Sequence, residues 1–314
     1  MQSLDVVVVG ELNADLILQD IPSLPQMGKE ILAKNMTLTM GSASAILATN
    51  IARLGLKVGF SGKLGDDHFG ELVLETLKNR GVDVEGIQES PNVQTGVTVV
   101  LSYPEDYAMV THMGAMESFG INDIDFNYLE RSGHLHFSSY YLQPEMRKGA
   151  PELFRRAKQM GLTTSFDPGW DPDEEWSEEI YELLQHVDVF MPNEQEAKYI
   201  AEKSDIDAAV DKLSDYCEVV VVTQGSRGSV CRIDDRTIRA GVFTVTPQDT
   251  TGAGDSFNAG FLSQWLAGED PKKCITYGSA CGAIATTKLG GSTASPTADE
   301  AAAFLQDHDE NIFK

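Results

Sequence analysis

The chain has 314 residues, of which 42% are hydrophobic, so it can bury a large core as one α/β domain. Its 24 lysines and arginines stand against 48 aspartates and glutamates, and the formal charge of -24 argues against binding to nucleic acid or to an anionic membrane. The four cysteines lack metal-ligand spacing, and residues 1–9 resemble neither a signal sequence nor a membrane span. We therefore expect a soluble cytoplasmic protein.

The first predicted element is a buried strand of a parallel sheet over residues 6–9, because four consecutive valines make both of its faces apolar. Residues 11–15 come directly after it, where an α/β sheet usually places its ligand contacts. Asn13 and Asp15 are therefore candidate binding residues. A plain turn is the alternative, since both residue types are common in turns.

Alternating apolar residues predict further strands over 30–40, 96–103 and 107–113. Pro104-Glu105-Asp106 predicts a hairpin turn between the last two. These strands interrupt the α/β rhythm of the chain and do not fit in one central sheet with the other strands. We predict a single domain over residues 1–314, with a small β-sheet lid formed by about 11–40 and 95–114.

From about residue 130 the pattern of strands and helices becomes regular, with buried strands predicted over 134–137, 162–166, 187–191 and 219–222. His134 and His136 share one face of the first of these strands, but no further ligand is near, so we do not expect a metal there. Asn193 and Glu196 follow the third strand. Glu196 could hold Mg²⁺ through water beside a triphosphate, whereas ordinary helix capping is the alternative.

The most informative stretch is Asp249-Thr250-Thr251-Gly252-Ala253-Gly254-Asp255-Ser256-Phe257. An apolar run over 242–245 predicts a strand before it, and apolar residues with helical spacing follow it to Leu266. Gly252 and Gly254 allow a tight turn, so that free N–H groups at the helix start can bind a phosphate. A carboxylate in this cradle would repel the phosphate, and Asp255 is therefore a candidate base that takes a proton from an attacking hydroxyl.

Two other kinds of glycine-loop site do not match the sequence. A Walker P-loop requires Gly-x-x-x-x-Gly-Lys-Ser/Thr, which the chain does not contain. A dinucleotide fingerprint requires a small residue where Phe257 stands and an acidic residue at the end of the next strand. The next acidic residues, Glu269 and Asp270, lie between two predicted helices. The loop therefore favours phosphoryl transfer, whereas a plain glycine turn with Asp255 as an ordinary helix-start residue is the alternative.

The stretch from Asp249 to Phe257 closely resembles the C-terminal signature of the ribokinase-like (PfkB) carbohydrate kinases, and the other motifs follow in the family's order from Gly10 to about Pro296. The resemblance implies a ribokinase-like α/β fold, with a mostly parallel central sheet flanked by helices and a small β-sheet lid. It implies ATP and Mg²⁺ as cofactors, Asp255 as the catalytic base, and the backbone of Gly252, Ala253, Gly254 and Asp255 as the anion hole.

The same resemblance implies roles for residues elsewhere in the chain. Asn13, Asp15 and Gly41 match positions that bind the sugar, and Glu196 matches one that binds Mg²⁺ through water. Positions near the nucleotide in the family correspond to Asn193, Thr223, Gly225 and Gly228. Asp249 and Thr251 match positions that bind a monovalent cation, potassium in several members, and Gly290-Gly291-Ser292 matches the loop that closes the adenine and cation sites.

The resemblance predicts the ATP-dependent phosphorylation of a sugar primary hydroxyl. Gly41 keeps the first glycine of the family's Gly-Gly-x-x-x-Asn pattern, but Ser42 replaces the second and Ile46 replaces the asparagine. Because that asparagine commonly contacts the sugar, the substrate stays open. A nucleoside kinase of the same fold and a non-catalytic sugar-sensing protein are the alternatives.

The lid strands also predict an assembly. A small sheet that stands off the core exposes an apolar face and unpaired edges, which proteins usually cover. Many ribokinase-like enzymes pair their lids in a two-fold dimer. We therefore expect a homodimer through lid residues such as Leu38, Val99 and Leu101, with a small sugar and ATP as the other partners.

Overall fold

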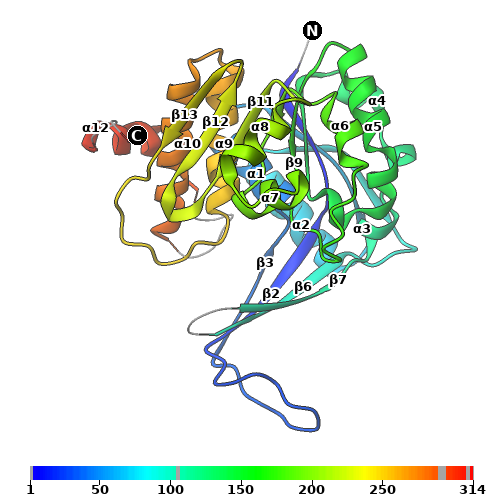
Figure 1. Cartoon of the computed structure of the whole chain (residues 1–314). Helices are drawn as coiled ribbons and strands as arrows, with labels where there is room; N and C mark the ends of the chain where they lie inside the picture. The colour runs from blue at the N-terminus through cyan, green and yellow to red at the C-terminus, as the bar shows by residue number, and fades with distance from the viewer. Residues whose placement is uncertain (1–2, 104–106, 289–294, 309–311, 314) are drawn as a thin grey trace.

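The computed structural model describes residues 3–103, 107–288, 295–308 and 312–313. A nine-stranded sheet with helices on both faces forms the body, and a smaller sheet extends from one end of it (Figure 1). The nine strands lie in the order β13-β12-β11-β10-β9-β8-β1-β4-β5. Neighbouring strands from β11 to β5 are parallel, and only the pairs that involve β12 and β13 are antiparallel. The expected mostly parallel α/β sheet is confirmed.

The strands of the body are β1 (Leu4–Val9), β4 (Val58–Gly65), β5 (Asp83–Ser90), β8 (Ser132–Ser138), β9 (Thr163–Asp167), β10 (Val189–Phe190), β11 (Val219–Thr223), β12 (Ser229–Ile233) and β13 (Arg236–Ala240). The longer helices are α1 (Ala43–Arg53), α2 (His68–Asn79), α5 (Pro144–Gln159), α6 (Ile180–Leu184), α7 (Glu194–Ala201), α8 (Ile206–Leu213), α9 (Ala253–Leu266), α10 (Pro271–Thr286) and α12 (Ala298–Asp307). None of the helices in the described ranges has the length and apolar character needed to cross a membrane.

The valines of β1 show why helices cover both faces of the sheet. Alternate side chains of a strand point to opposite faces, so an unbroken valine run needs an apolar partner on each side. Val7 and Val9 pack in the core that includes residues of α5, α6, α7 and α8. Val6 and Val8 pack in the other core, with residues of α1, α2, α9 and α10.

The prediction of a strand over 242–245 is wrong, because the last strand of the sheet ends at Ala240. Beyond this point the chain turns away from the sheet edge: the Gly241 N–H donates to the Ile312 carbonyl at 2.6 Å. Phe243 packs edge-on against the Phe304 ring of α12, with ring centroids 5.2 Å apart. The apolar residues of this segment therefore pack against α12 and line a cavity, and they do not form a strand.

The smaller sheet, which we call the lid, consists of β3 (Asn35–Met40), β2 (Asn13–Gln19), β6 (Gly96–Ser102) and β7 (Tyr107–His112), in that order. The strand predicted over 30–40 starts only at Asn35. Residues 104–106, the predicted hairpin turn, lie outside the described residues, and β6 and β7 pair in antiparallel register on either side of them. Figure 1 shows the lid projecting from the body.

The register of the lid strands separates polar from apolar side chains. Asp15 lies across from Thr39 and Thr98, and Thr98 lies across from Thr111, so these four share one face. The residues next to them, which form the opposite face, are Leu16, Leu38, Val99 and Val110. Leu38 and Val110 keep 44% and 66% of their surface exposed, so this apolar face is open in the single chain.

A row of buried polar side chains runs along β8 and β9. The ring nitrogens of His134 bond the hydroxyls of Thr163 at 2.8 Å and Ser165 at 2.7 Å. Those of His136 bond Ser165 at 2.7 Å and Ser138 at 2.9 Å. All four ring nitrogens are thus used in hydrogen bonds, and the described residues contain no group of three or more metal-ligating side chains. Burial lowers the pKa of His134 to about 4 and that of His136 to about 3.

We predict that these histidines make the fold sensitive to acid. Because their folded-state pKa values lie below the unfolded value of about 6.5, the stability they contribute is present above pH 6.5 and is lost as the pH falls toward 4. For each ring that stays neutral in the folded protein, the free energy of unfolding falls by about 1.4 kcal/mol per unit of decreasing pH in this window. Urea unfolding between pH 7.5 and 4.5 should show a shallower decline for His136→Gln than for the wild type, and parallel curves would contradict the assignment.

Candidate active site

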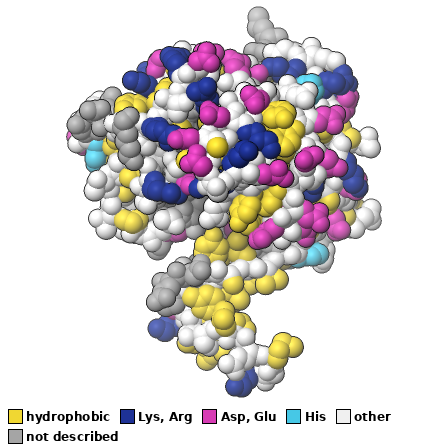
Figure 2. Space-filling view, in the orientation of Figure 1, with side chains coloured by type: hydrophobic (Ala, Val, Ile, Leu, Met, Phe, Trp, Pro, Cys, Tyr) yellow, Lys and Arg dark blue, Asp and Glu magenta, His cyan; other side chains and the backbone are white. Residues whose placement is uncertain are grey.

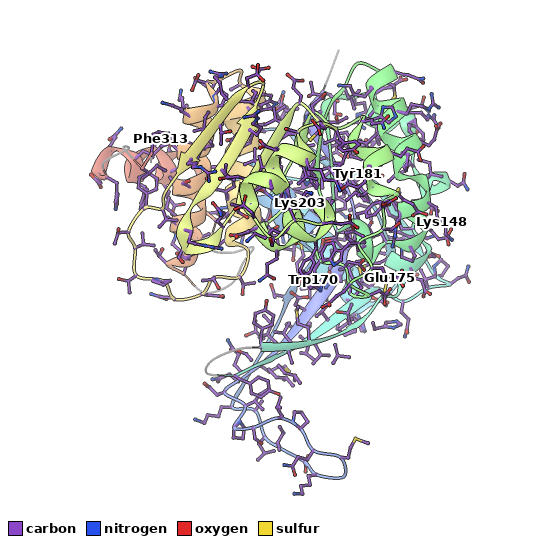
Figure 3. The ribbon with its side chains drawn as sticks, viewed as in Figure 1. Lys148, Trp170, Glu175, Tyr181, Lys203 and Phe313 are labelled. Atoms are coloured by element: carbon purple, nitrogen blue, oxygen red, sulfur yellow. The ribbon has the colours of Figure 1, made fainter. Side chains whose placement is uncertain are left out.

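The candidate site lies at the carboxyl edge of the parallel strands. Gly10 follows β1, Ser139 follows β8, and Asp167 ends β9, so these three neighbouring strands stop side by side. Loops after parallel strands meet at one edge, which is why ligands of α/β sheets bind there. Figure 3 labels Trp170, shortly after Asp167, at the end of the body from which the lid extends.

Asn13 and Asp15, the candidate binding residues, meet at the base of the lid. The Asn13 Nδ2 group donates to Asp15 Oδ1 at 2.9 Å and to Thr98 Oγ1 at 3.2 Å. Gly41 leaves room for this pair, because a Cβ atom at that position would lie 2.1 Å from Asp15 Oδ1. Burial raises the pKa of Asp15 to about 6, with repulsion from Glu11 adding to the effect and the Asn13 hydrogen bond opposing it.

Glu11 is a site residue that the sequence patterns did not single out. Its carboxylate is 3% exposed and accepts hydrogen bonds from the Ser44 hydroxyl, the Ser44 N–H at 3.2 Å and the Ser139 hydroxyl at 2.9 Å. These bonds tie the end of β1 to the start of α1 and to the segment after β8. Burial raises the pKa of Glu11 despite the three donors. In the sequence, a charged side chain shortly after a buried strand could have indicated this residue.

The glycine loop forms the start of α9. Gly252 adopts a left-handed conformation with φ 71°, which a residue without Cβ takes at no steric cost, and the helix begins at Ala253. The first N–H groups of a helix have no carbonyl partner within it, so the first turn of α9 presents donors and a partial positive charge. Asp255 lies in this turn. Its pKa is raised well above the ordinary value by burial and by repulsion from Asp167 and Glu11.

Asp167 is the second carboxylate that the sequence analysis did not assign. It accepts hydrogen bonds from Asn258 Nδ2 of α9 at 2.8 Å and from the Gly169 N–H at 3.0 Å. Its pKa is raised by burial and by repulsion from Glu11. The end of the strand predicted over 162–166 was visible in the sequence, but its proximity to Asp255 depends on how α9 crosses the sheet.

Glu196 has the capping role considered for it, and its role in holding Mg²⁺ stays a prediction. Asn193 caps α7 by accepting from the Gln195 and Glu196 N–H groups at 2.9 and 3.0 Å, and Glu196 Oε2 accepts from the Asn193 N–H at 2.8 Å. This is a reciprocal capping box. The Glu196 carboxyl group is also buried, and repulsion from Asp167 and Asp255 further raises its pKa. Capping therefore fixes a carboxylate close to two others.

A cavity of about 470 Å³ adjoins the glycine loop. Asn193, Thr223, Gly225 and Gly228 line it, so the four residues predicted near a nucleotide are brought together. The cavity is also lined by Ser226, Val242, Phe243, Val245, Pro247, Thr250, Ala253, Gly254, Phe257, Ser279, Gly282, Ala283 and Thr286. Its wall is mostly apolar, with the start of α9 at one side, which suits a flat ring system that carries phosphates.

The predicted monovalent-cation residues lie next to this loop. Asp249 Oδ1 accepts a hydrogen bond from the Thr251 N–H at 2.9 Å, and the Asp249 N–H donates to the Thr286 carbonyl at 3.2 Å. The two residues thus lie at the end of α10 and just before the glycine turn. The loop Gly290-Gly291-Ser292, assigned to the same region by resemblance, lies outside the described residues.

The chain resembles known proteins in both sequence and fold. Residues 3–298 match the model of the pfkB family carbohydrate kinases, and the chain therefore belongs to this family. An ATP-dependent ribose-1-phosphate kinase from Halopiger xanaduensis is 31% identical over 304 residues, which cover 96% of this chain and 98% of the relative.

Solved structures show the same fold. A ribokinase from Thermotoga maritima matches with a TM-score of 0.85 and 26% identity, over 96% of this chain and 99% of the other. An Arabidopsis thaliana ribokinase complexed with ribose and ATP matches with a TM-score of 0.86 and 25% identity, over 96% and 99% of the two chains. The predicted ribokinase-like fold is confirmed.

We predict that Gly41→Ala weakens acceptor binding without unfolding the protein. The new methyl group would displace the Asp15 carboxylate, since only 2.1 Å separates its position from Oδ1. A shift of about 1 Å in a binding group costs up to about 100-fold in activity, so kcat/KM for the acceptor should fall by about 10-fold to 100-fold. Steady-state kinetics should show an unchanged KM for ATP. A weaker binding of ATP alone would contradict this prediction, because it would place Gly41 beside the nucleotide instead of the acceptor.

Proposed function

We propose that this carbohydrate kinase transfers the terminal phosphoryl group of ATP to the primary hydroxyl of a pentose that already carries a phosphate. The position of Asp255 supports phosphoryl transfer. This residue lies in the donor-rich first turn of α9, next to the apolar cavity, and its carboxyl group is repelled by those of Asp167 and Glu11. The phosphorylated acceptor follows from the ribose-1-phosphate kinase that is 31% identical over nearly the whole chain.

The proposed reaction uses the two halves of the site together. Asn13 and Asp15 would bind acceptor hydroxyls and direct the primary hydroxyl toward Asp255. Asp255 accepts the proton as that oxygen attacks the terminal phosphorus, and the bond from phosphorus to the bridging oxygen breaks to release ADP. The N–H groups of Gly254 and its neighbours in the loop would stabilise the charge on the transferring group.

The carboxylates near the loop fit the cations that this chemistry uses. Glu196 and Asp167 offer hard oxygen ligands, which Mg²⁺ prefers, and repulsion between them is relieved when a cation lies nearby. Mg²⁺ held there through water would supply positive charge beside the phosphates. Asp249 and Thr251 would hold a monovalent cation such as K⁺ behind the glycine turn.

A coupled ADP-release assay tests the acceptor directly. We expect ribose 1-phosphate to give a higher kcat/KM than free pentoses, hexoses or nucleosides. A preference for free ribose or fructose would replace the phosphorylated acceptor, and a preference for nucleosides would favour the nucleoside-kinase alternative. If none of these acceptors caused ADP release, the result would favour a sugar-sensing role. Repeating the assay without Mg²⁺, and with tetramethylammonium in place of K⁺, tests both cation sites.

We predict that Asp255→Asn abolishes most of the turnover. The amide keeps the shape of the side chain but cannot accept a proton, so kcat should fall by about 10²-fold to 10⁴-fold. The KM for ATP should change little, because the N–H groups of the loop remain in place. Single-turnover kinetics with near-normal rates would show that another group is the base.

The apolar face of the lid supports a two-fold dimer. Leu16, Leu38, Val99 and Val110 lie side by side across four strands, and a face of this kind is usually covered by a partner. Figure 2 shows hydrophobic side chains along this part of the molecule. The opposite face, with Asp15 and Thr98, would remain free to cover the acceptor.

We predict that Leu38→Asp converts the dimer to a monomer, because it places a charge on the apolar face. Thr37→Asp is the matched control, since the neighbouring residue of the same strand points to the polar face. Light scattering at micromolar concentration should give the mass of two chains for the wild type and for Thr37→Asp. A wild-type mass of one chain would rule out the lid dimer.

A further inference from the structure

Helix α1 links the proposed acceptor side of the site to α9. Its N-cap is Ser42, whose hydroxyl donates to the Glu11 carbonyl at 2.6 Å. About two turns further along α1, the Asn50 Nδ2 group donates to Ser256 Oγ of α9 at 3.1 Å. Both of these side chains are buried, with 1% of their surface exposed. One hydrogen bond therefore connects the helix that begins beside the proposed acceptor residues to the first turn of α9.

Asn50 lies in a mostly apolar interface between the two helices. Ile51 of α1 and Phe257 and Phe261 of α9 belong to the same buried core. The Asn50 Oδ1 atom is also buried and has no hydrogen-bond partner among the described residues. A buried carbonyl oxygen without a partner destabilises a fold, and an apolar side chain of similar size would avoid that penalty. The stability of the fold therefore does not account for an asparagine at this position.

The first turn of α9 is held from two sides. The Asn50 amide bonds Ser256 from α1, and the Asn258 amide of α9 bonds Asp167 at the end of β9, at 2.8 Å. Because successive residues of an α-helix are rotated by about 100°, Ser256 and Asn258 point about 200° apart, toward nearly opposite sides of α9. The helix cannot turn about its axis without breaking one of these bonds. The orientation of Asp255, which precedes Ser256, is thereby fixed.

We propose that Asn50 is a positioning residue of the transfer step, which acts through Ser256 to hold the Asp255 carboxylate toward the acceptor hydroxyl. A base acts only within hydrogen-bond reach of the proton that it accepts, so a small rotation of α9 is sufficient to slow the reaction. Neither Asn50 nor Ser256 lines the cavity beside the glycine loop, so their bond affects turnover and leaves nucleotide binding unchanged. This inference rests on the proposed role of Asp255 as the base.

The first test removes the bond from either side. Asn50→Leu keeps the approximate size of the side chain, and Ser256→Ala removes only the hydroxyl. Each variant should lower kcat by about 10-fold to 100-fold, while the KM for ATP and for the acceptor changes by less than about 3-fold. The acceptor is ribose 1-phosphate or, where the wild type turns it over faster, free ribose. A wild-type kcat in either variant overturns the inference.

Unfolding in urea separates positioning from a structural role. Asn50→Leu removes an unpaired buried oxygen, so its urea midpoint should equal or exceed that of the wild type although its kcat falls. If kcat falls only in proportion to a loss of folded protein, the role of Asn50 is structural and the inference is wrong.

Thr49→Val is the matched control for this pair of variants. Thr49 is also buried on α1, but its hydroxyl donates to the Ile46 carbonyl of the same helix at 2.9 Å, and the new side chain has nearly the same shape. This variant should keep the wild-type kcat. A loss equal to that of Asn50→Leu would assign the effect to a general disturbance of α1 and would overturn the inference.

The last test places the effect on Asp255. Single-turnover rates of Asn50→Leu should fall as much as kcat, because the slowed step is the transfer itself. In an Asp255→Asn background, Asn50→Leu should cause a further loss of less than about 3-fold, since the group that it positions is already absent. A loss as large as in the wild-type background would show that Asn50 acts on another group.

These measurements also separate the inference from the proposed function. Near-normal turnover of Asp255→Asn alone would refute the proposed base and the role of Asn50 together. An inactive Asp255→Asn beside a fully active Asn50→Leu would refute the role of Asn50 and leave the proposed base in place.

Discussion

Repulsion between buried and half-buried carboxyl groups is the constraint on which the site depends. Glu11, Asp15, Asp167, Glu196 and Asp255 come together at the carboxyl edge of the sheet, and none of them forms an ion pair within the described part of the chain. Neutral donors hold them instead, among them serine hydroxyls, backbone N–H groups and the Asn13 and Asn258 amides. Such a cluster of like charges is costly by itself, and a bound cation would relieve the repulsion.

The hydrogen bonds of these carboxylates also join the two halves of the site into one frame. Glu11 connects the start of α1 to Ser139 after β8. Gly169 packs close to Ser139, because a Cβ atom at that position would lie 3.1 Å from the Ser139 Cα. Asp167, next to Gly169 in the chain, is bonded to Asn258 of α9. The proposed acceptor residues at the base of the lid are thus fixed relative to the helix that carries Asp255.

The lid shows how one small sheet can meet two requirements. A two-residue side-chain period gives one polar face, with Asp15 and Thr98, and one apolar face, with Leu38 and Val99. The polar face holds residues that we propose to bind the acceptor, whereas the apolar face is open in the single chain.

The sequence by itself determined the features that depend on neighbouring residues: the valine strand before Asn13, the glycine turn before Asp255, the capping motif at Glu196 and the alternation of the lid strands. It gave the wrong structure for 242–245, because apolar residues that wall a cavity resemble a strand when only their order is known. Glu11 and Asp167 were not assigned roles for a different reason. Only the tertiary structure decided that these carboxylates lie near Asp255, because it orders β9, β8 and β1 side by side and bonds Asn258 of α9 to Asp167, whereas local periodicity carries no information about which strand ends meet.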